Sequence, residues 1–283
     1  MKNIVILNKY NRNSTKINMK NNVPFISYRA LDRIPWLTNG FSTRLGGVST
    51  GCLSSMNLGL ERNDVHANVV KNHELIAQAI GFQPEKIVAS KQTHTTNVKI
   101  VSENECGKGV YFPRDYDDVD GMITNKKGIV LAAYFADCVP LYIVDTKNKA
   151  IGLSHSGWRG TVGRIGKATI ELMGQTYGTK PEDVVACIGP SICQDCYEVS
   201  EDVAGEFQKA FPQNAADILI DKGNGKYQLD LWECNHIIFR ECGVLEENIH
   251  LPDTCTCCNR DVLFSHRATG GKRGNLAAFL SIK

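Results

Sequence analysis

Three apolar runs in close succession constrain the fold of this 283-residue chain more than any other feature. They span residues 129–135, 139–144 and 150–153, and each has the length of a buried strand rather than of a helix. The last two are joined by residues 145–149, a turn-rich stretch that predicts a hairpin. We therefore expect a buried sheet at the centre of the molecule.

The remaining patterns add helices and further strands. Helices are predicted over 64–80, with Asp64 as N-cap and Gly81 as the stop, and over 161–177, 201–211 and 230–242. Further strands are predicted over 86–90, 98–101, 183–188 and 275–282. With no repeat and no long linker, the pattern indicates one mixed α/β domain, and the many strands argue against a plain doubly wound fold.

Composition excludes several classes of protein. A formal net charge of +2 and a pI of about 8.0 do not suggest nucleic-acid binding. No stretch approaches the roughly 18 apolar residues of a membrane span, and residues 1–10 lack the apolar core of a signal peptide. The 11 cysteines are an odd number. In the cytoplasmic location that we expect, such thiols are buried, bind metal or act as nucleophiles.

Three potential zinc ligands lie at the ends of predicted strands. His94 follows one strand, whereas Cys138 and His155 flank the hairpin, whose two ends must meet. Two imidazoles and one thiolate leave the fourth zinc position free, as in catalytic sites. Asp137 is a candidate to orient a ligand or to move a proton.

The same atoms allow two other interpretations. Cys138 and His155 could form a nucleophile–base pair, as in cysteine hydrolases. The three side chains could also be ordinary buried residues, because they match no compact zinc motif. Spacing alone does not decide between these interpretations.

A series of motifs then resembles the laccase-domain family, once labelled multicopper polyphenol oxidases, whose members are also named purine nucleoside phosphorylase or peptidoglycan editing factor. The series runs from about Phe41 to the C-terminal residues. Its motifs are Phe41-Ser-Thr-Arg44, Gly46-Gly47-Val48-Ser49, Asn57-Leu58-Gly59, Gln92-Thr-His94, Asp118-Val-Asp120-Gly121, Ala136-Asp-Cys-Val-Pro140, His155-Ser-Gly-Trp-Arg-Gly160, Ile188-Gly-Pro190, Cys196-Tyr-Glu198 and Phe264-Ser-His-Arg267.

The resemblance implies a single α/β domain with β-sheets sandwiched between helices, similar to cysteine-dependent toxin deamidases. It implies zinc on His94, Cys138 and His155. The implied activity is phosphorolysis of adenosine, inosine and methylthioadenosine, together with adenosine deamination. A cysteine hydrolase of peptidoglycan editing and a copper-dependent polyphenol oxidase remain alternatives. We expect one catalytic domain over 41–283, and assign no function to residues 1–40.

These activities suggest further site residues. Arg44 is a candidate for phosphate, because arginine binds anions in a bidentate manner and the glycines of its loop let backbone N–H groups approach. Arg159 is a second candidate, because it lies just before a predicted helix N-terminus, a favourable place for an anion. Gln92, of the Gln-Thr-His motif, is a third substrate-binding candidate. Asp118 and Asp120 are weaker candidates for a proton shuttle, because Asp120-Gly121 also predicts a turn.

Copper and the remaining cysteines are separate questions. A multicopper centre needs many histidines, but the chain has 7, and His66 and His73 are expected on a surface helix. Copper binding in vitro to a Cys/His site is still compatible with the general affinity order. The last group comprises Cys193, Cys196, Cys255, Cys257 and Cys258, which suggest a structural zinc site, a redox pair or unpaired thiols.

Overall fold

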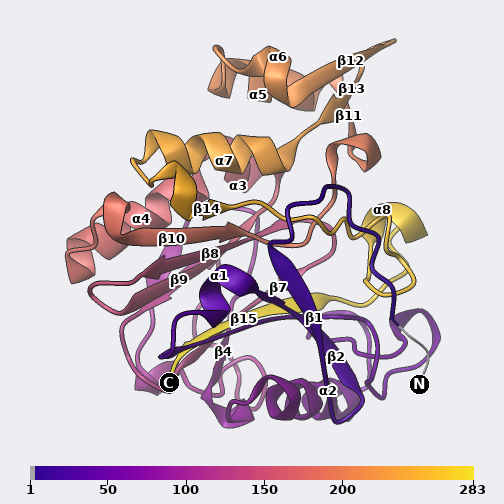
Figure 1. The fold of residues 1–283 in the computed structure, drawn as a ribbon. Coiled ribbons are helices and arrows are strands. Elements are labelled where there is room, and N and C mark those ends of the chain that lie inside the picture. The colour runs from indigo at the N-terminus through magenta and orange to yellow at the C-terminus, as the bar shows by residue number, and fades with distance from the viewer. Residues whose placement is uncertain (1–3) are drawn as a thin grey trace.

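Two six-stranded sheets dominate the computed structural model, which describes residues 4–283 (Figure 1). Sheet A has the order β1-β2-β3-β15-β7-β4. Its strands are Thr15–Lys20, Val23–Tyr28, Leu37–Ser42, Leu276–Ile282, Val130–Phe135 and Ile87–Ala89. Sheet B has the order β14-β10-β8-β9-β6-β5. Its strands are Ile249–His250, Val184–Ile188, Val139–Asp145, Ala150–Ser156, Gly121–Thr124 and Val98–Ile100.

The sheets pack face to face and helices cover their outer faces. Figure 1 shows α2 beyond sheet A, and α3, α4 and α7 beyond sheet B. These helices span His66–Ile80, Trp158–Val162, Ile165–Tyr177 and Leu231–Glu241. The predicted sandwich of sheets between helices is thus confirmed.

Strand β7 shows why the layers form. Its side chains alternate, because neighbouring residues of a strand point to opposite faces. Leu131, Ala133 and Phe135 join the core between the sheets, whereas Val130 and Ala132 pack with residues of α2. A strand buried on both faces has no polar positions, which explains its uninterrupted apolar sequence.

A smaller unit lies beyond α7. A three-stranded sheet of order β11-β13-β12 stands with α5 and α6 at the top of Figure 1. Its elements are Glu198–Ser200, Lys226–Leu229, Leu219–Gly223, Glu201–Ala210 and Ala215–Ile218. The two remaining helices are α1, Arg29–Asp32, and α8, His266–Thr269.

Most predicted elements are present, but two details are wrong. The helix predicted over 161–177 is divided into α3 and α4, because Arg164 adopts a left-handed φ of 62°. Its guanidinium donates to the carbonyl of Ala210 and pairs with Glu241, contacts that a local pattern does not reveal. Helix α2 begins after Val65 rather than Asp64, and the Asp64 carboxylate accepts hydrogen bonds from Ser49 and Asn57 instead.

His73 lies on the predicted surface helix, but on the face that packs against sheet A, where it is fully buried. Its Nδ1–H donates to the Val69 carbonyl at 2.8 Å, and its Nε2 accepts from the Tyr134 hydroxyl at 3.1 Å. Both ring nitrogens are therefore satisfied inside the protein.

Residues before the expected domain boundary belong to the same core. Strands β1 and β2 extend sheet A, and Ile26 and Tyr28 lie between the two sheets. The boundary at residue 40 falls inside β3. Within residues 4–283, no helix has the length and apolar character needed to cross a membrane.

Candidate active site

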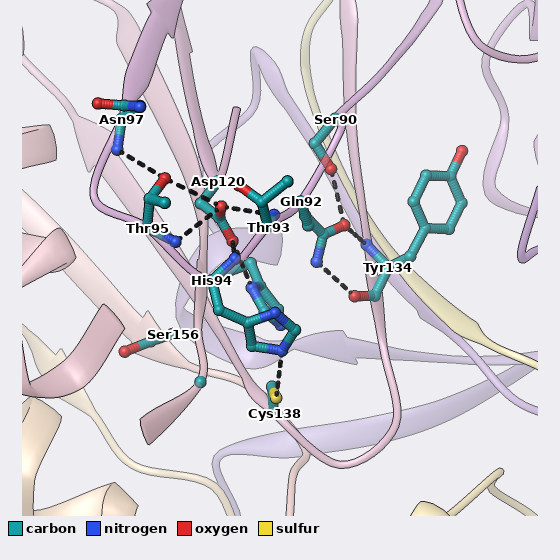
Figure 2. Close-up of polar contacts among 12 residues, drawn as sticks. Ser90, Gln92, Thr93, His94, Thr95, Asn97, Asp120, Tyr134, Cys138 and Ser156 are labelled. Carbon is teal, nitrogen blue, oxygen red and sulfur yellow. Dashed lines mark hydrogen bonds and ion pairs between the residues drawn. The ribbon is translucent and has the colours of Figure 1, made fainter. Parts of the chain in front are cut away.

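His94, Cys138 and His155 come together where the two sheets meet, and we call them the trio. His94 lies in the connection between β4 and β5, Cys138 between β7 and β8, and His155 in β9. Their potential ligand atoms all lie within 4.8 Å of one another. The Cys138 Sγ is 4.0 Å from His94 Nε2, and the two imidazole centroids are 4.9 Å apart (Figure 2).

The hairpin places two members of the trio. Strands β8 and β9 are antiparallel, and Pro140 is directly opposite His155. Cys138 comes immediately before β8, so its side chain reaches the same end of the hairpin as His155. This is the juxtaposition predicted from the sequence.

Asp120 positions both histidines. Its side chain is fully buried, and Oδ1 accepts from His155 Nδ1–H at 2.8 Å. The same carboxylate accepts the backbone N–H groups of Thr93, His94 and Thr95 at 2.9–3.1 Å (Figure 2). Because Asp120 bonds the Nδ1–H of His155, the Nε2 of His155 is free to face His94 and Cys138. This arrangement is typical of metal-ligating histidines.

Gly157 provides the space in which the trio assembles. A Cβ at this position would lie 2.9 Å from His94 Cδ2 and 3.2 Å from the Cys138 Sγ. A side chain would therefore push two of the three ligands apart. The motif glycine after His155 thus has a steric role.

Mutual charge interactions tune the trio. Desolvation alone would raise the pKa of Cys138, but His155 and His94 lower it to about 6. Desolvation likewise opposes the charged form of His155, but Cys138 and Asp120 raise its pKa to about 9. Desolvation would raise the pKa of Asp120, but the bonds from His155 and the backbone lower it to about 2. Without a metal, the group therefore favours thiolate, imidazolium and carboxylate.

The donor set fits a metal ion. Two imidazoles and a thiolate suit zinc, and the carboxylate behind His155 supplies the outer support that such ligands use. Binding would require His155 to lose its second ring proton, so metal affinity would rise with pH. The trio is therefore a candidate metal site with at most three protein ligands.

Two cavities open onto the trio and share His94, Ala136, Cys138 and Arg273 as lining residues. The first, which we call the Arg114 cavity, has a volume of about 170 Å³ and is also lined by Gln92, Arg114, Tyr134 and His155. The second, the Trp158 cavity, has a volume of about 410 Å³ and is also lined by Asp137, Trp158, Arg159, Ile192, Tyr197, His266 and Arg267. The volume of the Trp158 cavity suits a small-molecule ligand, whereas the Arg114 cavity is smaller than most such sites.

The structure brings some predicted substrate residues to these cavities. Arg159 lines the Trp158 cavity, and its guanidinium lies 4.2 Å from the Trp158 ring centroid. Gln92 lines the Arg114 cavity, but its amide donates to the Tyr134 carbonyl and accepts from the Tyr134 N–H, each at 2.7 Å. The side-chain amide of Gln92 thus pairs with the backbone of β7 as a neighbouring strand would, and it anchors the loop that carries His94 (Figure 2).

Arg44 is placed elsewhere. Its guanidinium donates to the carbonyls of Ser54 and Arg260 and lies 4.7 Å from the Phe264 ring centroid. In the described part of the chain, it lines neither cavity of the trio. Its Gly-rich loop is held together by these bonds.

Asp137 lies at the wall of the Trp158 cavity. One carboxylate oxygen accepts from Thr256 Oγ1 at 2.7 Å and the other from the Arg267 N–H at 2.8 Å. None of the hydrogen bonds among described residues joins this carboxylate to the trio. The group that contacts His155 is Asp120, which the sequence ranked lower because Asp-Gly also predicts a turn.

Arg273 was missed altogether. It lines both cavities, and its Nε has no hydrogen-bond partner within residues 4–283. Burial lowers its pKa to about 10, and nearby Arg62 adds to the effect. Its position in the Gly-rich stretch after α8 was the one available signal, because such loops approach ligands closely.

Comparisons with known proteins agree with this architecture. The family model described as multi-copper polyphenol oxidoreductase laccase matches residues 38–283. Purine nucleoside phosphorylase YlmD of Bacillus subtilis (strain 168) is 37% identical over 248 residues, covering 86% of this chain and 88% of that protein. Adenosine deaminase RL5, from an unknown prokaryotic organism, is 34% identical over 243 residues, covering 83% and 90%.

A solved structure extends the likeness to three dimensions. The hypothetical protein YfiH of Bacillus licheniformis matches with a TM-score of 0.89 at 28% identity, covering 97% of this chain and all of that one. The expected resemblance is confirmed. This chain belongs to the multi-copper polyphenol oxidoreductase laccase family.

Proposed function

We propose that this chain is a zinc-dependent purine nucleoside phosphorylase that acts on adenosine, inosine and methylthioadenosine and also deaminates adenosine. The observation that carries the proposal is the trio, braced by Asp120 and open to two cavities. Relatives named purine nucleoside phosphorylase and adenosine deaminase support this choice of substrate class.

The Trp158 cavity has a suitable surface for a purine. Trp158 and Tyr197 provide aromatic faces, and Ile192 adds apolar surface. Aromatic rings stack favourably with flat heterocycles, and burial of the base contributes hydrophobic free energy. We therefore place the base in this cavity, with its sugar directed to the trio.

Arg273 and Arg159 provide the positive charge that phosphate needs. Arg273 lies between the two cavities, so an anion bound there would face both the sugar and the trio. Its guanidinium, which lines both cavities, can donate to a phosphate oxygen. Arg159 would approach the same anion from the Trp158 side. Arg44 remains a predicted phosphate ligand only if its present bonds to carbonyls are broken.

The trio would hold the zinc, which when bound supplies a Lewis acid to polarise a substrate or water oxygen. Asp120 would keep His155 in the required tautomer and orientation, and Gly157 would keep the ligands in contact. Asp137 is our candidate for proton transfer during deamination, because it is among the residues that line the cavity proposed for the base. Gln92 would position the His94 loop.

A direct test combines metal analysis with product analysis. Purified protein reloaded with zinc is incubated with inosine or adenosine, with and without phosphate, and bases, ribose 1-phosphate and ammonia are measured. We expect phosphate-dependent base release that is lost with the active-site metal in Cys138→Ala. A zinc-loaded protein that releases neither base nor ammonia would falsify the proposal.

The arginines provide a matched pair of variants. Arg273→Met is expected to raise KM for phosphate by about 10- to 100-fold, since a charge-assisted hydrogen bond contributes roughly 1.5–3 kcal/mol. Arg44→Met is the control and is expected to leave this KM unchanged. If Arg44→Met has the larger effect on KM, the assignment of phosphate to Arg273 is wrong.

One observation favours a second candidate. Cys138, His155 and Asp120 also form the nucleophile–base–orienter arrangement of a cysteine hydrolase, and the lowered thiol pKa suits a nucleophile. Such an enzyme could act in peptidoglycan editing. Hydrolysis of peptidoglycan fragments that survives complete metal removal but is lost on alkylation of Cys138 would favour it. Copper-loaded protein that oxidises phenols faster than zinc-loaded protein cleaves nucleosides would favour a polyphenol oxidase.

A further inference from the structure

Four cysteines gather in a second cluster outside the trio. Cys193 and Cys196 lie between β10 and β11, and Cys255 and Cys258 lie between β14 and α8. Their four Sγ atoms all lie within 4.8 Å of one another, and those of Cys196 and Cys258 are 3.5 Å apart. We call this group the four-cysteine cluster.

The spacing along the chain is the same in both halves. Each segment contributes a Cys-x-x-Cys pair, 193 with 196 and 255 with 258. Two such pairs are the usual source of ligands in tetrahedral structural zinc sites. Either pair alone is weak evidence, but the fold unites pairs that are 62 residues apart.

The backbone holds the two segments together at this point. Ser191 and Cys255 form a parallel bridge, and the Thr256 N–H donates to the Ser191 carbonyl at 3.0 Å. The Cys255 Sγ accepts the N–H groups of Cys193 at 3.3 Å and Cys258 at 3.5 Å. A neutral thiol is a weak acceptor, whereas a thiolate bound to a metal accepts such bonds well.

We propose that the four-cysteine cluster binds a structural zinc ion, separate from the metal of the trio. Four thiolates complete the coordination of zinc, so the site leaves no position for substrate. Cys193 and Cys255 are buried and Cys258 is exposed, which places the cluster at the surface end of the loops. Zinc binding would release the thiol protons to solvent and change no oxidation state.

The proposed ion joins two walls of the Trp158 cavity. Ile192 and Tyr197 flank the first pair of cysteines, and Arg267 follows the second pair. Between Cys255 and Cys257, Thr256 donates to the Asp137 carboxylate, next to Cys138. The ion would therefore hold the cavity wall in place without contacting substrate.

A disulfide is the competing interpretation of the same cluster. The 3.5 Å between the Cys196 and Cys258 sulfurs is far longer than the roughly 2.05 Å of a disulfide bond. One disulfide would also leave the other two thiols without a role. Zinc accounts for all four.

The first experiment isolates this site from the trio. In a Cys138→Ala background, reduced metal-free protein is titrated anaerobically with Co²⁺ and then with Zn²⁺. We expect one equivalent of Co²⁺ with the strong sulfur-to-cobalt absorption of a tetrathiolate site, displaced by Zn²⁺. Adding Cys258→Ser should abolish this absorption, and Cys257→Ser, whose thiol lies outside the cluster, should retain it. Equal binding by the two serine variants, or no binding by the parent, overturns the proposal.

A second measurement needs no substitution. Alkylation of the freshly purified protein is followed residue by residue by mass spectrometry, before and after a chelator is added. Cys258 and Cys52 are both exposed. We expect Cys258 to react many-fold more slowly than Cys52 until the chelator removes the metal. Equal rates, or protection removed by a reductant but not by a chelator, contradict zinc and identify a free thiol or a disulfide. Neither measurement depends on nucleoside turnover.

Discussion

The trio and the four-cysteine cluster lie in adjacent loops but differ in what surrounds them. The trio mixes nitrogen and sulfur donors, has a buried carboxylate behind it and faces two cavities. The four-cysteine cluster has sulfur donors alone, is supported by backbone N–H groups and links two loops. A site with three protein ligands and a carboxylate behind them leaves room for substrate, as catalytic metal sites do, whereas four protein ligands complete the coordination and are typical of structural sites. The following predictions test whether this division holds, or measure the background stability against which it is judged.

The largest effect is expected at the carboxylate behind the trio. Asp120→Asn keeps the shape of the side chain but places an amide where four N–H groups need an acceptor. We expect zinc affinity at the trio and kcat/KM to fall by about 10- to 100-fold. The measurements are a competitive zinc titration and the nucleoside assay.

Asp118→Asn is the matched control for that prediction. Asp118 accepts from Thr95 Oγ1 at 2.8 Å in the same loop but does not contact His155. An equal loss of zinc affinity in both variants would mean that loop order, rather than the bond to His155, determines metal binding. Metal content of the four-cysteine cluster should be unchanged in either variant.

Acid should weaken the fold independently of both clusters, through His73. Burial lowers the pKa of His73 from its usual 6.5 to about 4, so the unfolded chain binds the proton more readily. The stability due to neutral His73 is therefore present above pH 6.5 and is lost as the pH falls toward 4. Between pH 7 and 5 we expect His73 to account for a loss of about 2 kcal/mol, measured in urea on metal-free protein as the difference between the parent and His73→Gln.

His73→Gln should flatten this pH dependence, although it lowers stability at neutral pH. His66→Gln, on the exposed side of the same helix, should retain it. If the slope persists in His73→Gln, another group is responsible. The pH at which each cluster releases its metal can be compared only after the loss of stability due to His73 is subtracted.

The smallest effect is expected where the two clusters are linked. Thr256→Val removes one hydrogen bond to Asp137, which keeps its bond from the Arg267 N–H. We expect a loss of about 1 kcal/mol in the free energy of unfolding. Nucleoside KM should rise a few-fold, because Asp137 is at the wall of the Trp158 cavity. If KM does not change while stability falls, the clusters act independently.

Much of the fold could be predicted because its central strands are buried on both faces. Strands β7 and β8 and the first half of β9 are almost entirely apolar, and the predicted hairpin places Cys138 next to His155. The break at Arg164 could not be predicted, because its cause is a contact with α7 and the end of α5. His73 shares a helix face with Val69 and Ile76, which a stricter use of helical periodicity would have noticed.

The residues that surround the trio were less predictable than the trio itself. Gln92 and Arg159 line the cavities beside the trio, but the hydrogen bonds of Gln92 are to the backbone of Tyr134. Arg44 lies in the Gly-containing loop for which phosphate binding was predicted, but its guanidinium donates to the carbonyls of Ser54 and Arg260. Arg273 reaches both cavities through tertiary packing alone, which no local motif encodes.

The place of β15 in sheet A has a consequence for how the protein is made. Residues 276–282 lie between β3 and β7 and pair with both in antiparallel register. During synthesis, the two halves of sheet A therefore cannot pair until β15 has left the ribosome, after every other strand of this sheet. Their unpaired edges remain exposed through that interval, when nascent chains are most prone to aggregate. Loop closure over more than 230 residues should also make this pairing a slow event in refolding.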